Sequence, residues 1–192
     1  MQASDDYMGE YLPYNDRSIS FCMNKLTVPQ RKTHRVGVFV DVSNMYHSAK
    51  NLYKARVNFK ELLRLTAGNR ELVRAVAYVV KSDTEEEKAF FGALEKAGFE
   101  LKSKDLQIFP GGMKKGDWDV GIAIDAITLS RQLDVVVIIS GDGDYEPLVD
   151  YLKFSGLVVE VAGFNRSTSA RLIDAANNFL DLEAVKDRVL LR

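Results

Sequence analysis

The chain has 192 residues, of which 46% are hydrophobic and 28% charged, and its formal net charge is −1. These values are typical of a soluble single domain with tails and exclude a strongly basic surface, so any nucleic-acid contact must come from a local patch. A single cysteine, Cys22, excludes an internal disulfide or a Cys-rich zinc site, and the lack of a long apolar stretch predicts a cytoplasmic protein without a membrane span.

The N-terminal residues 1–33 differ from the rest of the chain. Tyr7, Tyr11 and Tyr14 lie in an acidic stretch without regular periodicity. We expect a tail that is either disordered or docked on a partner, and a leader without a role is the alternative. The predicted domain covers residues 34–182, and we expect residues 183–192 to be a C-terminal tail or helix end.

From residue 35 onward, predicted strands and helices alternate. Strand 35–41 is followed by a helix with Ser43 as its N-cap, and Asn58 begins a second helix that reaches about residue 67. After strand 72–80, Ser82 and the acidic residues behind it start a helix that ends at Gly98, a C-cap signal.

The second half of the chain continues this alternation. Its predicted elements are a strand-like stretch 99–109 interrupted at 102–105, a turn at 110–112, a helix opened by residues 115–119 and reaching about 132, strand 135–139, helix 145–154 closed by Gly156, strand 157–162, helix 168–176 and a short segment 179–182. Repeated strand–helix alternation predicts a three-layer α/β/α fold with a mainly parallel central sheet.

Two predicted strands end in carboxylates. A run of β-branched residues ends at Ile139 and continues into Ser140-Gly-Asp-Gly-Asp144, and the first strand ends in Asp41. Such apolar runs are typical of parallel strands covered on both faces, and ligands of open α/β sheets bind at the carboxyl ends of these strands. If the two strands are neighbours, Asp41 and Asp142 point into one crevice. Asp119, in the first turn of the preceding helix, is a third acid for the same rim.

Carboxylates at this density require a compensating charge. Two charges roughly 4 Å apart repel by about 4 kcal/mol at an effective dielectric constant near 20. Either some of them are protonated or a divalent cation binds. An all-oxygen set suits Mg²⁺ or Mn²⁺, which can activate a water and stabilise a phosphoryl transition state. The predicted ligands are Asp41, Asp119, Asp142 and Asp144.

Several other residues have predicted roles near these acids. Asn44, Ser140 and Lys115 are predicted to contact the substrate. Asn44 adds a neutral carbonyl or amide group beside the first strand, Ser140 is also placed to orient Asp142, and Lys115 precedes Asp119 closely enough to meet a phosphate backbone. Asp125 lies six residues after Asp119, or about 240° around the helix, and therefore points elsewhere. It either supports the site from behind or is a buried, hydrogen-bonded acid.

Each of these residues also has a structural interpretation. Asp41 and Asp142 can cap the helices that follow them, Asp144 can open the next helix, and the adjacent glycines can be turn residues. Lys115 can lie in a solvated loop. The combination of two strand exits with an acid-bearing helix start favours a metal site. No P-loop, dinucleotide fingerprint, nucleophile elbow or Cys/His pair is present to indicate another chemistry.

These features resemble the NYN domain family of PIN-like nucleases, and most closely its LabA-like bacterial group. The resemblance rests on three segments in order: Val38-Phe-Val-Asp-Val-Ser-Asn44, Lys115-Gly-Asp-Trp-Asp-Val-Gly-Ile-Ala-Ile-Asp125 and Val137-Ile-Ile-Ser-Gly-Asp-Gly-Asp-Tyr145. It implies a PIN-like α/β fold and Mg²⁺- or Mn²⁺-dependent cleavage of RNA at an acidic groove. Carried over by position, its site acids are Asp41, Asp119, Asp142 and Asp144. One departure is Asn177-Asn178-Phe179, where such proteins often carry an acid before the final aromatic residue.

Three functions follow as hypotheses. The first is a metal-dependent ribonuclease in which a water held by the cation attacks a phosphodiester. The second is a catalytically weak or inactive regulator that binds RNA or a protein partner through the same groove. The third is a phosphatase or nucleotide hydrolase with the same metal. The oligomeric state is open, with a homodimer as one option.

Overall fold

The structure is a computed structural model that describes residues 31–81, 84–108 and 114–191. Its centre is a parallel sheet with the strand order β4-β3-β1-β7-β8-β9. The strands are β1 Arg35–Asp41, β3 Glu71–Lys81, β4 Glu100–Asp105, β7 Val135–Ile139, β8 Val158–Gly163 and β9 Asn178–Asp181. The predicted sheet is therefore confirmed.

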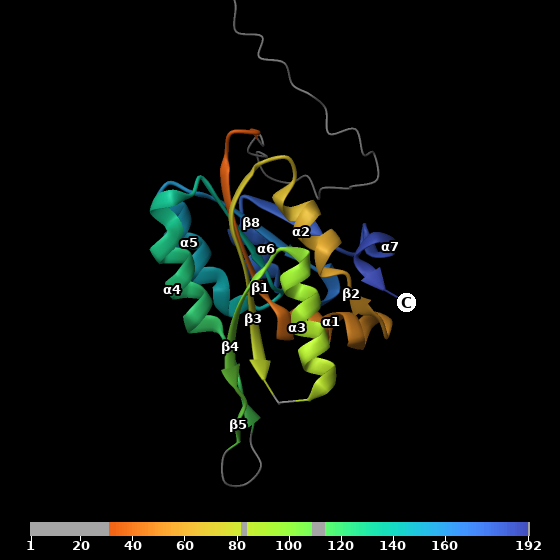
Figure 1. Ribbon diagram of the computed structural model, residues 1–192. Coiled ribbons are helices and arrows are strands. Elements are labelled where there is room, and N and C mark those ends of the chain that lie inside the picture. Colours follow the sequence, from red (N-terminus) through yellow and green to blue (C-terminus); the bar gives the residue numbers. More distant parts are fainter. Residues whose placement is uncertain (1–30, 82–83, 109–113, 192) are drawn as a thin grey trace, which may run out of the picture.

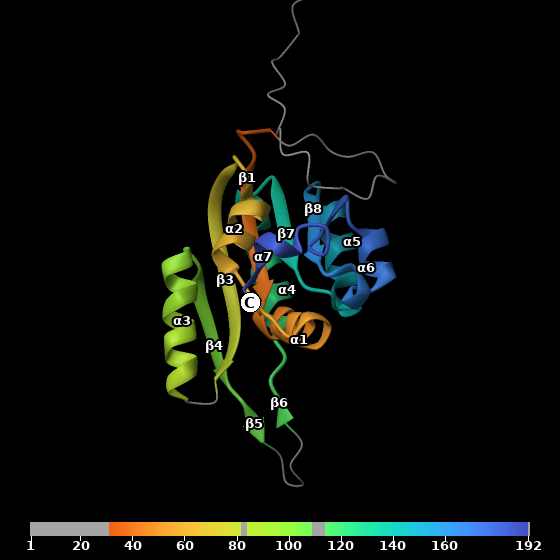
Figure 2. The same cartoon turned by 90° about the vertical axis from the view of Figure 1, so that its right-hand side faces the viewer.

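Helices cover both faces of this sheet (Figures 1 and 2). On one face lie α1 Val42–Tyr53, α2 Phe59–Ala67 and α3 Glu85–Ala97; on the other lie α4 Asp119–Leu129, α5 Glu146–Phe154 and α6 Ala170–Ala175. All five residues of β7 are buried, and they alternate between the two hydrophobic clusters. This alternation follows from the two-residue period of a strand and explains why both faces of β7 are apolar. The three-layer α/β/α prediction is confirmed.

The order of the strands defines one topological switch point. The chain runs from β1 outward through β3 to β4, then returns to the other side of β1 and continues through β7, β8 and β9. The helices after β1 and β7 leave the sheet on opposite faces, α1 on one and α5 on the other. A crevice at the carboxyl ends of β1 and β7 is the place where open α/β sheets bind ligands.

Shorter elements complete the fold. These are β2 Arg56–Val57, the hairpin of β5 Gln107–Ile108 with β6 Lys114–Lys115, η1 Ser130–Gln132, η2 Gly143–Tyr145, η3 Asn165–Ser167, α7 Lys186–Val189 and β10 Leu190–Leu191. The β5–β6 hairpin projects beyond the sheet next to β4 (Figure 2). The segment after residue 182, predicted to be a tail or helix end, packs onto the domain because β10 pairs with β2 and Val189 is fully buried.

Some predicted boundaries differ from the structure. The N-cap of α1 is Asp41, not Ser43, and the N-cap of α3 is Thr84, whereas Ser82 lies outside the described residues. The stretch 102–105 does not interrupt a strand, because β4 runs through it. As an edge strand with exposed positions, β4 does not need the continuous apolar pattern of a central strand. Most of the predicted tail, residues 1–30, also lies outside the described part.

Candidate metal centre

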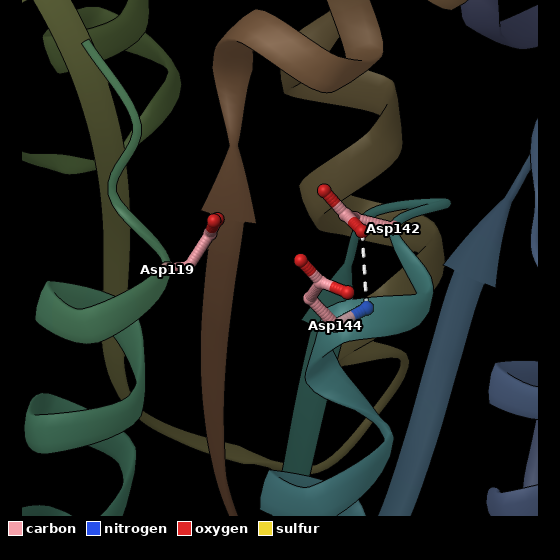
Figure 3. A group of neighbouring side chains, drawn as sticks. All are labelled: Asp119, Asp142 and Asp144. Atoms are coloured by element: carbon pink, nitrogen blue, oxygen red, sulfur yellow. Dashed lines mark hydrogen bonds between the residues drawn. The ribbon is translucent and has the colours of Figure 1, made fainter. Parts of the chain in front are cut away.

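Three carboxylates converge at the switch point. Asp119, Asp142 and Asp144 each offer an oxygen atom, and these three atoms lie within 4.8 Å of one another. In Figure 3, Asp119 projects from the start of α4 toward Asp142 and Asp144, which belong to the loop and turn after β7. Asp119 and Asp142 are half-buried and Asp144 is exposed, so the cluster opens to solvent on the side of Asp144.

The loop that carries Asp142 is held by hydrogen bonds from both sides. The amide of Asp142 donates to Oγ of Ser140 at 3.2 Å, and the amide of Gly141 donates to Oδ1 of Asn44 at 2.9 Å. The Asp142 carboxylate accepts from the amide of Asp144 at 3.0 Å as the cap of η2. These bonds fix the direction of Asp142 before any ligand binds.

Gly141 and Gly143 are needed for close packing. Neither has a positive φ in this structure, so a left-handed turn is not the reason for glycine. A Cβ atom on Gly141 would lie 2.2 Å from the Ser167 carbonyl oxygen, and one on Gly143 would lie 2.8 Å from Oγ of Ser169. The loop therefore passes directly against the segment after β8, and this contact sets its path.

Asp119 is positioned from the other side of the crevice. It is the first residue of α4, and its Oδ1 accepts a 2.9 Å hydrogen bond from the hydroxyl of Tyr145. Burial raises the pKa of Asp119, and the nearby Asp142, Asp117 and Asp144 raise it further, while the Tyr145 hydrogen bond acts in the opposite direction. Burial likewise raises the pKa of the Tyr145 hydroxyl, which keeps it a hydrogen-bond donor.

Asp41 lies beside this cluster and outside the group of three. Its Oδ1 accepts from the amide of Asn44 at 3.0 Å and caps α1. Burial raises the pKa of Asp41, and the charges of Asp119 and Asp142 raise it further, while the hydrogen bond from the Asn44 amide acts in the opposite direction. The sequence interpretation of Asp41 as a helix cap is correct, and its predicted role as a ligand stays a prediction.

The three converging acids fit a hard divalent cation. Oxygen ligands lie about 2.1 Å from Mg²⁺, so two ligands on opposite sides of the ion are about 4.2 Å apart, and a spread of 4.8 Å needs only small side-chain rotations. None of the ion pairs within the described parts of the chain involves these three residues or Asp41. A cation would therefore relieve the repulsion that raises the pKa values.

The other residues predicted to belong to the site lie outside the three-acid cluster. The Ser140 side chain is fully buried, and its hydroxyl accepts a hydrogen bond from the Asp142 amide, as its predicted role of orienting Asp142 requires. Its contact with substrate stays a prediction. Asn44 uses its amide oxygen to hold Gly141. Lys115 lies on β6 of the projecting hairpin, and the structure describes its backbone pairing with Gln107.

Asp125 is a half-buried structural acid held by hydrogen bonds, close to one of the two roles predicted for it. Its carboxylate accepts from the hydroxyl of Tyr78 at 2.6 Å and from the ammonium of Lys102 at 2.7 Å. It thereby ties α4 to β3 and β4, away from the three acids. Asn177 and Asn178, where the resemblance led us to look for an acid, lie at the beginning of β9 and therefore at the opposite end of the parallel sheet.

Tyr145 was not identified as a site residue from the sequence. The only sequence feature that indicates a role in the site is its position directly after the acid pair. A tyrosine in an apolar motif is otherwise typical of a packed core. The side chain is indeed 1% exposed and packs among α4, α5 and the sheet, with only its hydroxyl directed at Asp119.

Comparisons with known proteins agree with this architecture. The protein LabA ("Low amplitude and bright protein LabA") of Synechococcus elongatus is 26% identical over 161 residues, which are 79% of this chain and 86% of LabA. The crystal structure of a protein of unknown function from Vibrio parahaemolyticus is 33% identical, with a TM-score of 0.77, and the match covers 85% of this chain and 100% of the other. A family model described as NYN domain matches residues 35–183. The chain belongs to the NYN domain family.

Proposed function

We propose that this protein is a metal-dependent ribonuclease whose Mg²⁺ or Mn²⁺ is held by Asp119, Asp142 and Asp144. The observation that carries the proposal is the 4.8 Å convergence of one oxygen atom from each of these acids at the switch point of the sheet. The family supports the reaction class, because NYN domains are generally nucleases. Asp41, directly behind the cluster, adds to the negative charge that favours a cation.

The exposure of each acid to solvent supports a different role in the reaction. When bound, the cation supplies a water of lowered pKa and neutralises charge on the phosphodiester. Asp119 and Asp142, half-buried and fixed by hydrogen bonds, serve as the rigid ligands. Asp144 is the exposed member, so its free oxygen is best placed to accept a proton from the attacking water. Ser140 and Asn44 position the loop, and Lys115 is proposed to meet the RNA backbone at the edge of the site.

Cleavage of labelled single-stranded and hairpin RNA tests this proposal. Wild type should cleave with Mn²⁺ or Mg²⁺ and stop when a chelator is added. Asp142→Asn and Asp119→Asn should each lower the rate by roughly 100-fold or more, because each removes a charged ligand. Asp150→Asn, an exposed acid on α5, is the matched control and should cleave like wild type. Equal rates for wild type and both site variants would refute a ribonuclease at these acids.

A non-catalytic regulator that binds RNA or a protein through the same crevice is the second candidate. The observation in its favour is that Asp41 and Asp142 both cap helices, a structural use that needs no catalysis. This function predicts no turnover with any metal and RNA binding that survives the Asp→Asn changes. Small phosphomonoesters, assayed beside the RNAs, separate both candidates from a phosphatase or nucleotide hydrolase.

A further inference from the structure

A groove lies between α1 and α3, which cover the same face of the sheet (Figure 2). It has a volume of about 1020 Å³ and a mainly apolar lining. Ser43 on its wall comes two residues after Asp41, and Gly116 comes three residues before Asp119. One end of this α1–α3 groove therefore opens next to the crevice that holds the acids.

One wall of the groove belongs to a segment that carries only positive charge. Residues 42–60 contain Lys50, Lys54, Arg56 and Lys60 and no aspartate or glutamate, although the net charge of the whole chain is −1. All four side chains are exposed, and none of them takes part in an ion pair within the described parts of the chain. The segment is therefore the local basic patch that binding of a nucleic acid requires in a chain without an overall positive charge.

The opposite wall has a different chemistry. Helix α3 lines the groove with Phe90, Phe91 and Leu94, and its acids Glu86 and Glu87 lie in the first turn. These acids repel phosphates, so a polyanion in the groove is drawn toward residues 42–60 and its apolar groups toward the rings of α3. None of the described helices is long and apolar enough to cross a membrane.

Tyr46 connects the basic wall to the apolar lining. Its side chain lines the groove and is 43% exposed. The ammonium of Lys50 donates a 3.3 Å hydrogen bond to the Tyr46 hydroxyl and lies 5.4 Å from the centre of the ring, and the ring of His47 lies edge-on at 5.4 Å. An exposed aromatic ring beside a cation is the arrangement on which the bases of single-stranded nucleic acids stack.

We propose that the α1–α3 groove binds unpaired RNA, with the phosphates along residues 42–60, a base stacked on Tyr46 and further bases against the apolar lining. The inference rests on the proposed ribonuclease, because a strand in this groove leads directly into the crevice of the acids. A duplex cannot bind in this way, since its bases are paired and stacked inside the helix. A protein segment is the other ligand class for an apolar groove, but a wall with only positive charges favours a ligand that carries regularly spaced negative charges.

Fluorescence anisotropy with the full-length protein tests the groove. The probes are a short labelled RNA without self-complementarity and a duplex of the same length, and a chelator prevents cleavage. Wild type should bind the single strand roughly tenfold more tightly than the duplex. Tyr46→Ala should weaken single-strand binding roughly fivefold or more, through the loss of one base–aromatic stack. Tyr151→Ala, at a tyrosine on α5 that is 50% exposed on the other face of the sheet, should bind like wild type.

The salt dependence of binding tests the basic wall. Arg56→Gln and Lys60→Gln should each lower the slope of log affinity against log salt concentration by about 0.7, the value for one phosphate contact of a single strand. Arg131→Gln, at an exposed arginine after α4, is the matched control and should keep the wild-type slope. Circular dichroism and thermal melts confirm that the variants are folded.

The outcomes separate this inference from the proposed function. Equal affinities for the single strand and the duplex, wild-type binding by Tyr46→Ala, or no RNA binding by wild type would each overturn the groove assignment, and the last would leave the groove to a protein segment. Binding in the chelator does not depend on catalysis. Normal single-strand binding without cleavage would therefore refute only the ribonuclease, and cleavage that is unchanged in Tyr46→Ala, Arg56→Gln and Lys60→Gln would refute only the groove.

Discussion

The hydroxyl of Tyr145 donates a 2.9 Å hydrogen bond to Oδ1 of Asp119 and so connects the turn after β7 to the first residue of α4. Asp119 is the only member of the three-acid group that does not belong to the 140–144 segment. Without this bond, its direction depends on the helix terminus alone. The remaining oxygen of the carboxylate is left for a ligand.

Replacing Tyr145 with phenylalanine tests this positioning role. The ring stays in the core, but Asp119 loses its donor, and we expect Mn²⁺ affinity to fall by roughly tenfold, as for other groups that orient metal ligands. Isothermal titration calorimetry measures the affinity. Tyr151→Phe, at a half-exposed tyrosine on α5, should bind Mn²⁺ like wild type. Unchanged affinity in Tyr145→Phe would mean that α4 alone orients the carboxylate.

Two substitutions at Asp41 separate its capping role from a metal role. Asparagine caps a helix about as well as aspartate, so Asp41→Asn should keep the stability of wild type. Asp41→Ala should lose about 1 kcal/mol relative to Asp41→Asn, because the amide of Asn44 loses its acceptor. Chemical denaturation measures the difference.

Variants of Asp41 also test whether this residue binds the metal. Asp41 lies outside the group of three, so Asp41→Asn should weaken Mn²⁺ binding less than Asp142→Asn does. Equal losses of affinity would place Asp41 among the ligands and contradict its assignment here as a neighbouring charge.

Asp125 should matter for stability and little for metal binding. Asp125→Ala leaves the fully buried hydroxyl of Tyr78 without its acceptor, at a cost of about 1–3 kcal/mol in unfolding free energy. Adding Tyr78→Phe removes that unpaired hydroxyl and should recover part of the loss. Denaturant unfolding of the single and double variants, with Mn²⁺ titrations at 25 °C, provides the check. A large loss of Mn²⁺ affinity in Asp125→Ala would count against this assignment.

Gly141 should not tolerate a side chain. In Gly141→Ala the new methyl group would lie 2.2 Å from the backbone oxygen of Ser167, so the loop carrying Asp142 must move. We expect a loss of at least about 2 kcal/mol in stability and weaker Mn²⁺ binding. Gly92→Ala in α3 is the control, since nothing lies within 4 Å of the added atom. That change should stabilise the protein by about 0.5–1 kcal/mol because alanine favours a helix. Similar stabilities of Gly141→Ala and Gly92→Ala would contradict this prediction, because they would show that the loop can move at little cost in free energy.

A buried ion pair braces the end of the sheet opposite the acids. Arg70 donates to Glu160 at 3.0 Å, and both side chains are nearly inaccessible. Glu160→Leu leaves the Arg70 charge buried and uncompensated, and should cost about 3–5 kcal/mol. The double variant Arg70→Met/Glu160→Leu should regain most of this loss, because an apolar pair of similar volume replaces the ions. Urea unfolding midpoints measure the stability of both variants. A double variant that is as unstable as Glu160→Leu would contradict the prediction.

Local patterns were sufficient to predict most of the fold. The run that ends at Ile139 has no polar residue, so a strand buried on both faces was predicted directly. Gly98 was recognised as a C-cap and has the positive φ that this role favours. The β5–β6 hairpin was not predicted, because two-residue strands carry no periodicity. The break expected at 102–105 was wrong because β4 has exposed positions at the sheet edge, where polar residues are tolerated.

The candidate site was predictable where the acids end a strand or begin a helix. Asp119, Asp142 and Asp144 all have such positions, and the structure brings them together. The partners of these acids were not predictable. Tyr145 reaches Asp119 across 26 residues, and Tyr78 reaches Asp125 across 47, so these contacts depend on how α4 packs against the sheet. Sequence spacing within one element does not contain that information.

The hydrogen bond from Gly141 to Asn44 joins residues that are 97 positions apart in the chain. It forms only after β7 has paired with β1, and this pairing must wait until residues 135–139 have been synthesised. A nascent chain that already carries Asp41 and Asp119 therefore lacks the assembled crevice, and long-range closure of this kind is a late and slow step in folding. The cation site proposed above therefore depends on completion of the sheet, because its acids converge only when β7 lies beside β1.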